Sequence, residues 1–204
     1  MDIFQSVLIN NSISFNQDDS LEKLIRFNYK KINLESLLID PNCHDYKCFE
    51  ILKELIKDDN FKETLIEGYI NDEIRPFKSN LWEVLDLVKY RDCDNLSEAF
   101  KRGLNIGNCT NFAKEMGIVF EDSEICFGEV PLLEGTFNCP EGDHTWISIG
   151  GEIYDTSLMI IMTEDFSKRL GYQEIFRCKI DDINYYEAKR EYAKKDMPKL
   201  TLKK

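Results

Sequence analysis

Hydrophobic spacing separates a helix-like first half of the chain from a strand-like second half. Before residue 20, MDIFQSVLI and SISFN flank Asn10-Asn11 and are predicted as two short strands around a turn. From Ser20 onward, apolar residues recur every three or four positions, which is typical of amphipathic helices. Further helices are predicted over residues 49–56, 61–69, 81–90 and 95–100. We therefore expect residues 1–100 to form a mainly helical region.

The pattern changes after Gly103, where glycines become frequent and short β-rich runs lie between them. A helix is predicted over 111–116, strands over 125–130 and 173–180, and a charged helix over 181–195. Between them, residues 144–149 and 152–156 form a predicted hairpin, and Thr163 is placed to cap a short helix that ends near Leu170. Helices followed by antiparallel strands predict an α+β fold.

The predicted hairpin determines which side chains share a face. If Gly150-Gly151 is a two-residue loop, facing residues have numbers that sum to 301, so Asp155 lies opposite Trp146. Because side chains alternate between faces, His144, Trp146 and Asp155 point to the same side of the hairpin. His144 and Asp155 are then diagonal neighbours about 7–8 Å apart, within reach of each other's side chains. The carboxylate is expected to orient the imidazole and to favour its protonated form.

Cys109 is expected to open a helix, because Gly107 and Asn108 are turn residues and helical spacing follows them. A thiol at that position is close to the positive end of the helix dipole, which lowers its pKa. The free N–H groups of the first turn can also bind an oxyanion. Asn108 is a candidate additional donor, although an asparagine beside a glycine also serves turns. The sequence thus predicts a nucleophile, a base and an orienting carboxylate.

The segments GNCTNFA, DHTWISI and GEIYDTS, in this order, resemble the transglutaminase-like branch of the papain-like cysteine enzymes. The resemblance covers roughly residues 105–157 and implies a core over 101–204, in which the nucleophile helix packs on an antiparallel sheet. It implies Cys109 as nucleophile, His144 as general base and acid, and Asp155 as orienting carboxylate. From their positions beside these residues, we also expect Trp146 and Asn108 to bind substrate. The implied activity is cofactor-free acyl transfer through a thioester, by hydrolysis or by transfer, on a peptide, protein or small amide substrate.

The sequence departs from that family in two places near the motifs. The stretch between Cys109 and His144 is shorter than in many members, and Thr156-Ser157 follows the aspartate where proline is frequent. Each residue also has a structural alternative: a buried core thiol for Cys109, a turn-capping carboxylate for Asp155 and core packing for Trp146. A non-enzymatic acidic binding or immunity-type protein on the same fold therefore stays open.

Net charge narrows the expected partners, and the number and spacing of the cysteines indicate whether disulfides or a metal site are expected. The formal net charge is -12, which disfavours nucleic acid and anionic membrane surfaces. No leader-like start or long apolar run is present, so a cytoplasmic protein is expected. Seven cysteines, an odd number, predict reduced thiols rather than a disulfide framework. Cys43, His44 and Cys48 lack a second pair at the usual spacing, so no metal site is predicted.

Overall fold

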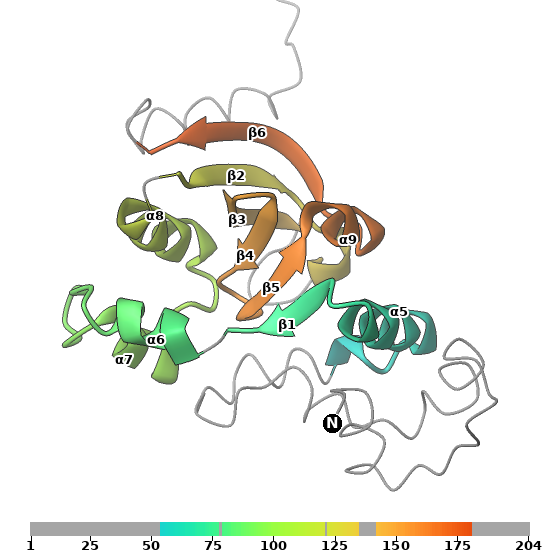
Figure 1. The fold of residues 1–204 in the computed structure, drawn as a ribbon, viewed down its shortest axis with the longest axis horizontal. Coiled ribbons are helices and arrows are strands. Elements are labelled where there is room, and N and C mark those ends of the chain that lie inside the picture. The colour runs from blue at the N-terminus through green and yellow to red at the C-terminus, as the bar shows by residue number, and fades with distance from the viewer. Residues whose placement is uncertain (1–53, 78, 121, 135–141, 181–204) are drawn as a thin grey trace, which may run out of the picture.

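The computed structural model describes residues 54–77, 79–120, 122–134 and 142–180 (Figure 1). The strands and first helix predicted before residue 49, most of the helix predicted over 49–56, the Cys43-His44-Cys48 motif and the helix predicted over 181–195 lie outside the described residues. The described part contains helices and an antiparallel sheet, which confirms the α+β class.

One sheet organises the described residues, with its six strands in the order β1-β5-β4-β3-β2-β6 and every neighbouring pair antiparallel. Its strands are β1 (Ile74–Pro76), β2 (Glu124–Glu129), β3 (Asp143–Ile149), β4 (Glu152–Asp155), β5 (Ile160–Thr163) and β6 (Gln173–Lys179). The helices are α5 (Asp59–Ile70), α6 (Ser79–Leu85), α7 (Leu96–Lys101), α8 (Cys109–Val119) and α9 (Glu164–Arg169), with a short 3-10 helix at Pro131–Leu133.

Local capping explains where several of these helices begin. The Asn95 side chain accepts a hydrogen bond of 2.8 Å from the backbone N–H of Glu98, which satisfies one of the N–H groups that the first turn of α7 leaves unpaired. Thr163 caps α9 in the same way through the N–H of Phe166 at 3.2 Å, as predicted. The helix predicted over 81–90 is confirmed only in part, because α6 ends at Leu85.

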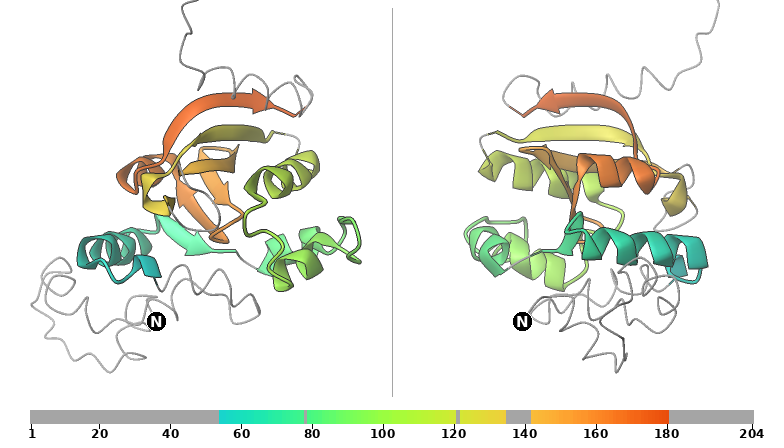
Figure 2. Two further views of the ribbon diagram at one scale, coloured as in Figure 1. Left: turned by 180° about the vertical axis from the view of Figure 1, so that it is seen from behind. Right: turned by 45° about the vertical axis from the view of Figure 1, so that its right-hand side comes forward.

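The central strands of the sheet are buried on both faces, so the described part has three layers. Along β3, Trp146 packs with the apolar residues of α5 and α9, whereas its neighbour Ile147 packs with those of α6, α7 and α8. Side chains of one strand alternate between the faces, so two separate hydrophobic clusters cover the sheet. Figures 1 and 2 show α5 and the α6–α7 pair at opposite ends of β1, with β6 at the far edge of the sheet.

Strand β1 comes from the region before residue 101 and pairs with β5, so the sheet includes chain from both sides of that position. Neither β1 nor β5 was among the predicted strands. Pro76 ends β1, and a proline is tolerated there because β1 is an edge strand. Across the described ranges, no helix has the length and apolar character that crossing a bilayer requires.

Candidate active site

The β3–β4 hairpin has the register that the sequence predicts. Ile147 faces Tyr154 and Ser148 faces Ile153, so the numbers of facing residues sum to 301. At the open end of this hairpin, Nε2 of His144 lies 2.7 Å from Oδ2 of Asp155. Both side chains are buried, with 4% of the imidazole and none of the carboxylate exposed. The predicted contact between these two residues is therefore confirmed.

Asp155 makes four hydrogen bonds, which fix its carboxylate in one orientation. Oδ1 accepts the backbone N–H groups of Ser157 at 2.7 Å and Leu158 at 2.9 Å. Oδ2, which contacts His144, also accepts the hydroxyl of Tyr172 at 2.5 Å. The carboxylate thus caps a turn and orients the histidine at once, so both sequence-based alternatives for Asp155 are realised. Tyr172 was not predicted as a site residue.

Charges within this cluster shift the pKa values of its members in opposite directions. Burial alone would raise the pKa of Asp155, but the charge and hydrogen bond of His144 and the hydroxyl of Tyr172 lower it. Burial would lower the pKa of His144, yet Asp155 and the thiol of Cys109 raise it well above 6.5. Burial and the adjacent carboxylate raise the pKa of Tyr172 well above 10.0, so its hydroxyl keeps its proton and donates. These shifts favour the imidazolium form of His144 and the carboxylate form of Asp155.

The thiol of Cys109 adjoins this ion pair. Cys109 begins α8 as predicted, and the Oγ1 atoms of Thr110 and Thr145 lie 2.9 Å apart, which ties the start of α8 to β3 beside His144. Burial opposes ionisation of the thiol, but its hydrogen bond to His144, the charge of that ring and the backbone N–H of Thr145 together lower its pKa. Because Asp155 occupies Nε2, Nδ1 is the ring nitrogen that remains for the sulfur. Cys109 as a whole residue is only partly buried.

The first turn of α8 has no side chain that caps it. Its N-cap residue, Asn108, donates its amide to the carbonyl of Leu104 at 2.9 Å instead. The first N–H groups of a helix have no partner within the helix, and they favour negative charge. The start of α8 can therefore stabilise an oxyanion that forms on a carbonyl bound to the sulfur. A direct contact between Asn108 and substrate stays a prediction.

Two further residues fix the surroundings of the cluster. Trp146 is 2% exposed, and its ring centre lies 5.2 Å from that of Tyr172 and 6.1 Å from that of His144. Its ring shields the buried ion pair from water, and its role as a substrate contact stays a prediction. Asn105 is fully buried and donates its amide to the carbonyl of Thr156 at 2.8 Å, which ties the turn after β4 to the segment that enters α8.

The other described cysteines differ from Cys109. All of them are free thiols, but Cys93, Cys126 and Cys178 are buried. Burial raises the pKa of Cys126 far above its ordinary value, so it stays a neutral thiol. Among the described residues, no group of three or more histidine, cysteine, aspartate or glutamate side chains is arranged to hold a metal ion.

Comparison of the chain with known protein families, curated proteins and solved structures finds no match. Function must therefore be inferred from the side chains themselves.

Proposed function

We propose that this protein is a cysteine-dependent enzyme that transfers acyl groups through a thioester on Cys109. One observation carries the proposal: the thiol of Cys109, at the start of α8, adjoins the buried His144, whose Nε2 is held 2.7 Å from the carboxylate of Asp155. A nucleophile beside a base that a third group orients is the arrangement that covalent catalysis requires.

The proposed mechanism starts from a thiolate on Cys109 and an imidazolium on His144. The thiolate of Cys109 attacks the carbonyl carbon of an amide, a C–S bond forms, and the carbonyl oxygen becomes an oxyanion near the first turn of α8. The imidazolium of His144 then gives its proton to the leaving nitrogen, and the C–N bond breaks to leave the thioester. Next, His144 removes a proton from water or from an acceptor amine as it attacks the thioester, and the C–S bond breaks. Water gives hydrolysis, and an amine gives transfer.

The arrangement of the core favours a likeness to the papain and transglutaminase type. Helix α8, which begins with Cys109, packs against β3, which carries His144, and Asp155 ends the adjacent strand β4. This order of nucleophile, base and carboxylate agrees with the motif resemblance described above. We accordingly propose a peptide, a protein or a small amide as the substrate.

Acylation by p-nitrophenyl acetate tests the proposal. We expect a burst of nitrophenolate equal to the amount of enzyme, one acetyl group on the Cys109 peptide by mass spectrometry, and release of that group by hydroxylamine. Cys109→Ala should abolish the burst, and His144→Gln should slow it about 10²–10⁴-fold because general acid–base catalysis is lost.

Cys178→Ala is the matched control, since it removes a buried thiol on β6 and should leave the burst unchanged. Equal acetylation of the control and Cys109→Ala variants would contradict the proposal. A folded protein with no reactive thiol would favour the alternative of a non-enzymatic binding protein.

A further inference from the structure

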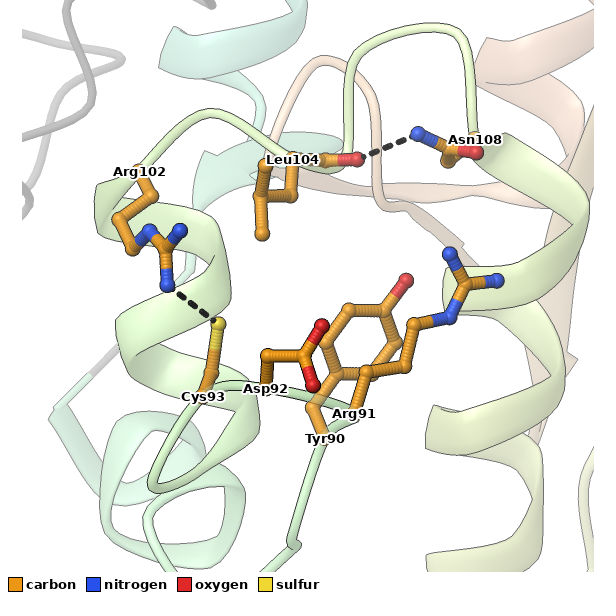
Figure 3. Close-up of a pocket in the computed structure, with 7 residues that line it drawn as sticks. All are labelled: Tyr90, Arg91, Asp92, Cys93, Arg102, Leu104 and Asn108. Carbon is orange, nitrogen blue, oxygen red and sulfur yellow. Dashed lines mark hydrogen bonds between the residues drawn. The ribbon is translucent and has the colours of Figure 1, made fainter.

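A pocket of about 230 Å³ adjoins the start of α8 (Figure 3). Residues from the segment between α6 and α7, from the end of α7 and from the segment before α8 line it: Tyr90, Arg91, Asp92, Cys93, Arg102, Leu104 and Asn108. Asn108 immediately precedes Cys109, so the Cα atoms of these two residues are about 3.8 Å apart. The pocket therefore lies at the end of α8 that carries the proposed nucleophile.

Tyr90 brings an unsatisfied polar group to this pocket. The residue is 3% exposed, and its ring centre lies 4.7 Å from that of Phe112, which holds the ring in place. Its hydroxyl is buried and has no hydrogen-bond partner among the described residues. Figure 3 shows this hydroxyl pointing into the space that the lining residues surround. Buried hydroxyls are seldom left without a partner, so this one is available to donate a hydrogen bond to an acceptor bound in the pocket.

Two arginines give the pocket a positive charge in a protein whose formal net charge is -12. Figure 3 shows the guanidinium groups of Arg91 and Arg102 on opposite sides of the pocket, with the carboxylate of Asp92 between them. Arg102 donates one hydrogen bond to the sulfur of Cys93 at 3.1 Å, and the guanidinium carbon of Arg91 lies 5.3 Å from the ring centre of Tyr90. Within the described ranges, neither arginine forms a salt bridge, so each keeps donors for an anion.

We infer that this pocket binds a carboxylate group, and that the acyl substrate of Cys109 carries it. Two arginines opposed by Asp92 leave one net positive charge, which complements one carboxylate group. A planar guanidinium and a phenolic hydroxyl both donate hydrogen bonds that a carboxylate can accept. Binding of the carboxylate is independent of the enzymatic activity, whereas its place on the substrate rests on the proposed function.

Thermal unfolding with added glutarate tests the binding site, with neutral glutaramide as the control and sodium chloride to hold ionic strength constant. We expect glutarate alone to raise Tm, by an amount that gives its Kd. Arg91→Gln and Tyr90→Phe should each weaken glutarate binding about tenfold, because each removes a hydrogen bond to a charged group. Asp92→Asn should tighten it severalfold, and Lys101→Gln, which removes a positive charge on α7 outside the pocket lining, should leave it unchanged.

Two results would overturn the binding site: a shift with glutaramide equal to that with glutarate, or equal weakening in the Lys101→Gln and Arg91→Gln variants. Tighter binding of inorganic phosphate than of glutarate would overturn the assignment to a carboxylate. Tyr90→Phe keeps the ring that packs on Phe112 and loses only an unpartnered hydroxyl, so the variant is expected to fold.

Acylation rates then separate this inference from the proposed function. Wild-type protein should acylate Cys109 faster with the p-nitrophenyl monoester of glutaric acid than with neutral p-nitrophenyl butyrate. The ratio of these two rates should fall about tenfold in Arg91→Gln. Reaction of Cys109 with butyrate but no preference for the anionic ester refutes the substrate assignment and leaves the proposed function standing. No reaction of Cys109 with either ester refutes the proposed function and, with it, the substrate assignment.

Discussion

Removal of one hydroxyl, in the Tyr172→Phe variant, tests how the buried carboxylate is held. The variant deletes the donor that lies 2.5 Å from Oδ2 of Asp155 and keeps the ring that packs edge-on against Trp146. A hydrogen bond to a charged group contributes about 1.5–3 kcal/mol, so we expect the free energy of unfolding of the variant to be about 2 kcal/mol lower than that of wild type. In a domain of this size, that loss lowers Tm by about 4–8 °C.

Thermal and urea unfolding followed by circular dichroism measure this loss. Tyr69→Phe is the matched control: Tyr69 is half-buried on α5, and its hydroxyl makes no hydrogen bond among the described residues. We expect this control to change the free energy of unfolding by less than about 0.5 kcal/mol. Equal stability of the two variants would refute the view that Tyr172 stabilises the carboxylate.

The remaining predictions concern the ion pair and its packing. Asp155→Asn leaves the imidazolium of His144 buried without its counter-charge, and should cost about 3–5 kcal/mol of stability at pH 6 by urea unfolding. Because folding lowers the pKa of Asp155, its carboxylate stabilises the fold fully above the ordinary value of 3.8, and this stabilisation is lost as pH falls through the lower folded-state pKa. A pH series of Tm should show this loss in wild type and not in Asp155→Asn. Gly128→Ala should lower Tm severely, because the added Cβ would lie 2.1 Å from the backbone oxygen of Gln173 and 2.6 Å from the ring of Trp146. A Tm equal to that of wild type would contradict this packing.

The cluster of Cys109, His144 and Asp155 could be predicted from the sequence where it depends on local structure. A two-residue turn at Gly150-Gly151 sets the register of the hairpin, and the period of two then places His144 beside Asp155. Turn residues before Cys109 and helical spacing after it predict the start of α8. Each of these features depends only on residues that are neighbours in the chain or across one hairpin.

Features that depend on distant parts of the chain were missed. Strand β5 is apolar at each of its first three positions because both of its faces are buried, so it shows no alternation of polar and apolar residues. Strand β1 has only three residues and ends at Pro76. From the sequence alone, a proline at this position indicates a break between two helices. Tyr172 reaches Asp155 only after the chain has passed through β5 and α9, and a single tyrosine after Gly171 carries no local signal of that contact.

The pKa of the Cys109 thiol tests the central claim most directly. The rate of alkylation by iodoacetamide, followed on the Cys109 peptide by mass spectrometry across pH, reports the fraction of thiolate. In wild type we predict an inflection below the ordinary cysteine value of 9.0, because His144 lowers the pKa against the effect of burial. In His144→Gln the inflection should move above 9.0, since burial then acts without the opposing charge. An inflection at or above 9.0 in wild type, or no change in the variant, would contradict the thiolate–imidazolium pair.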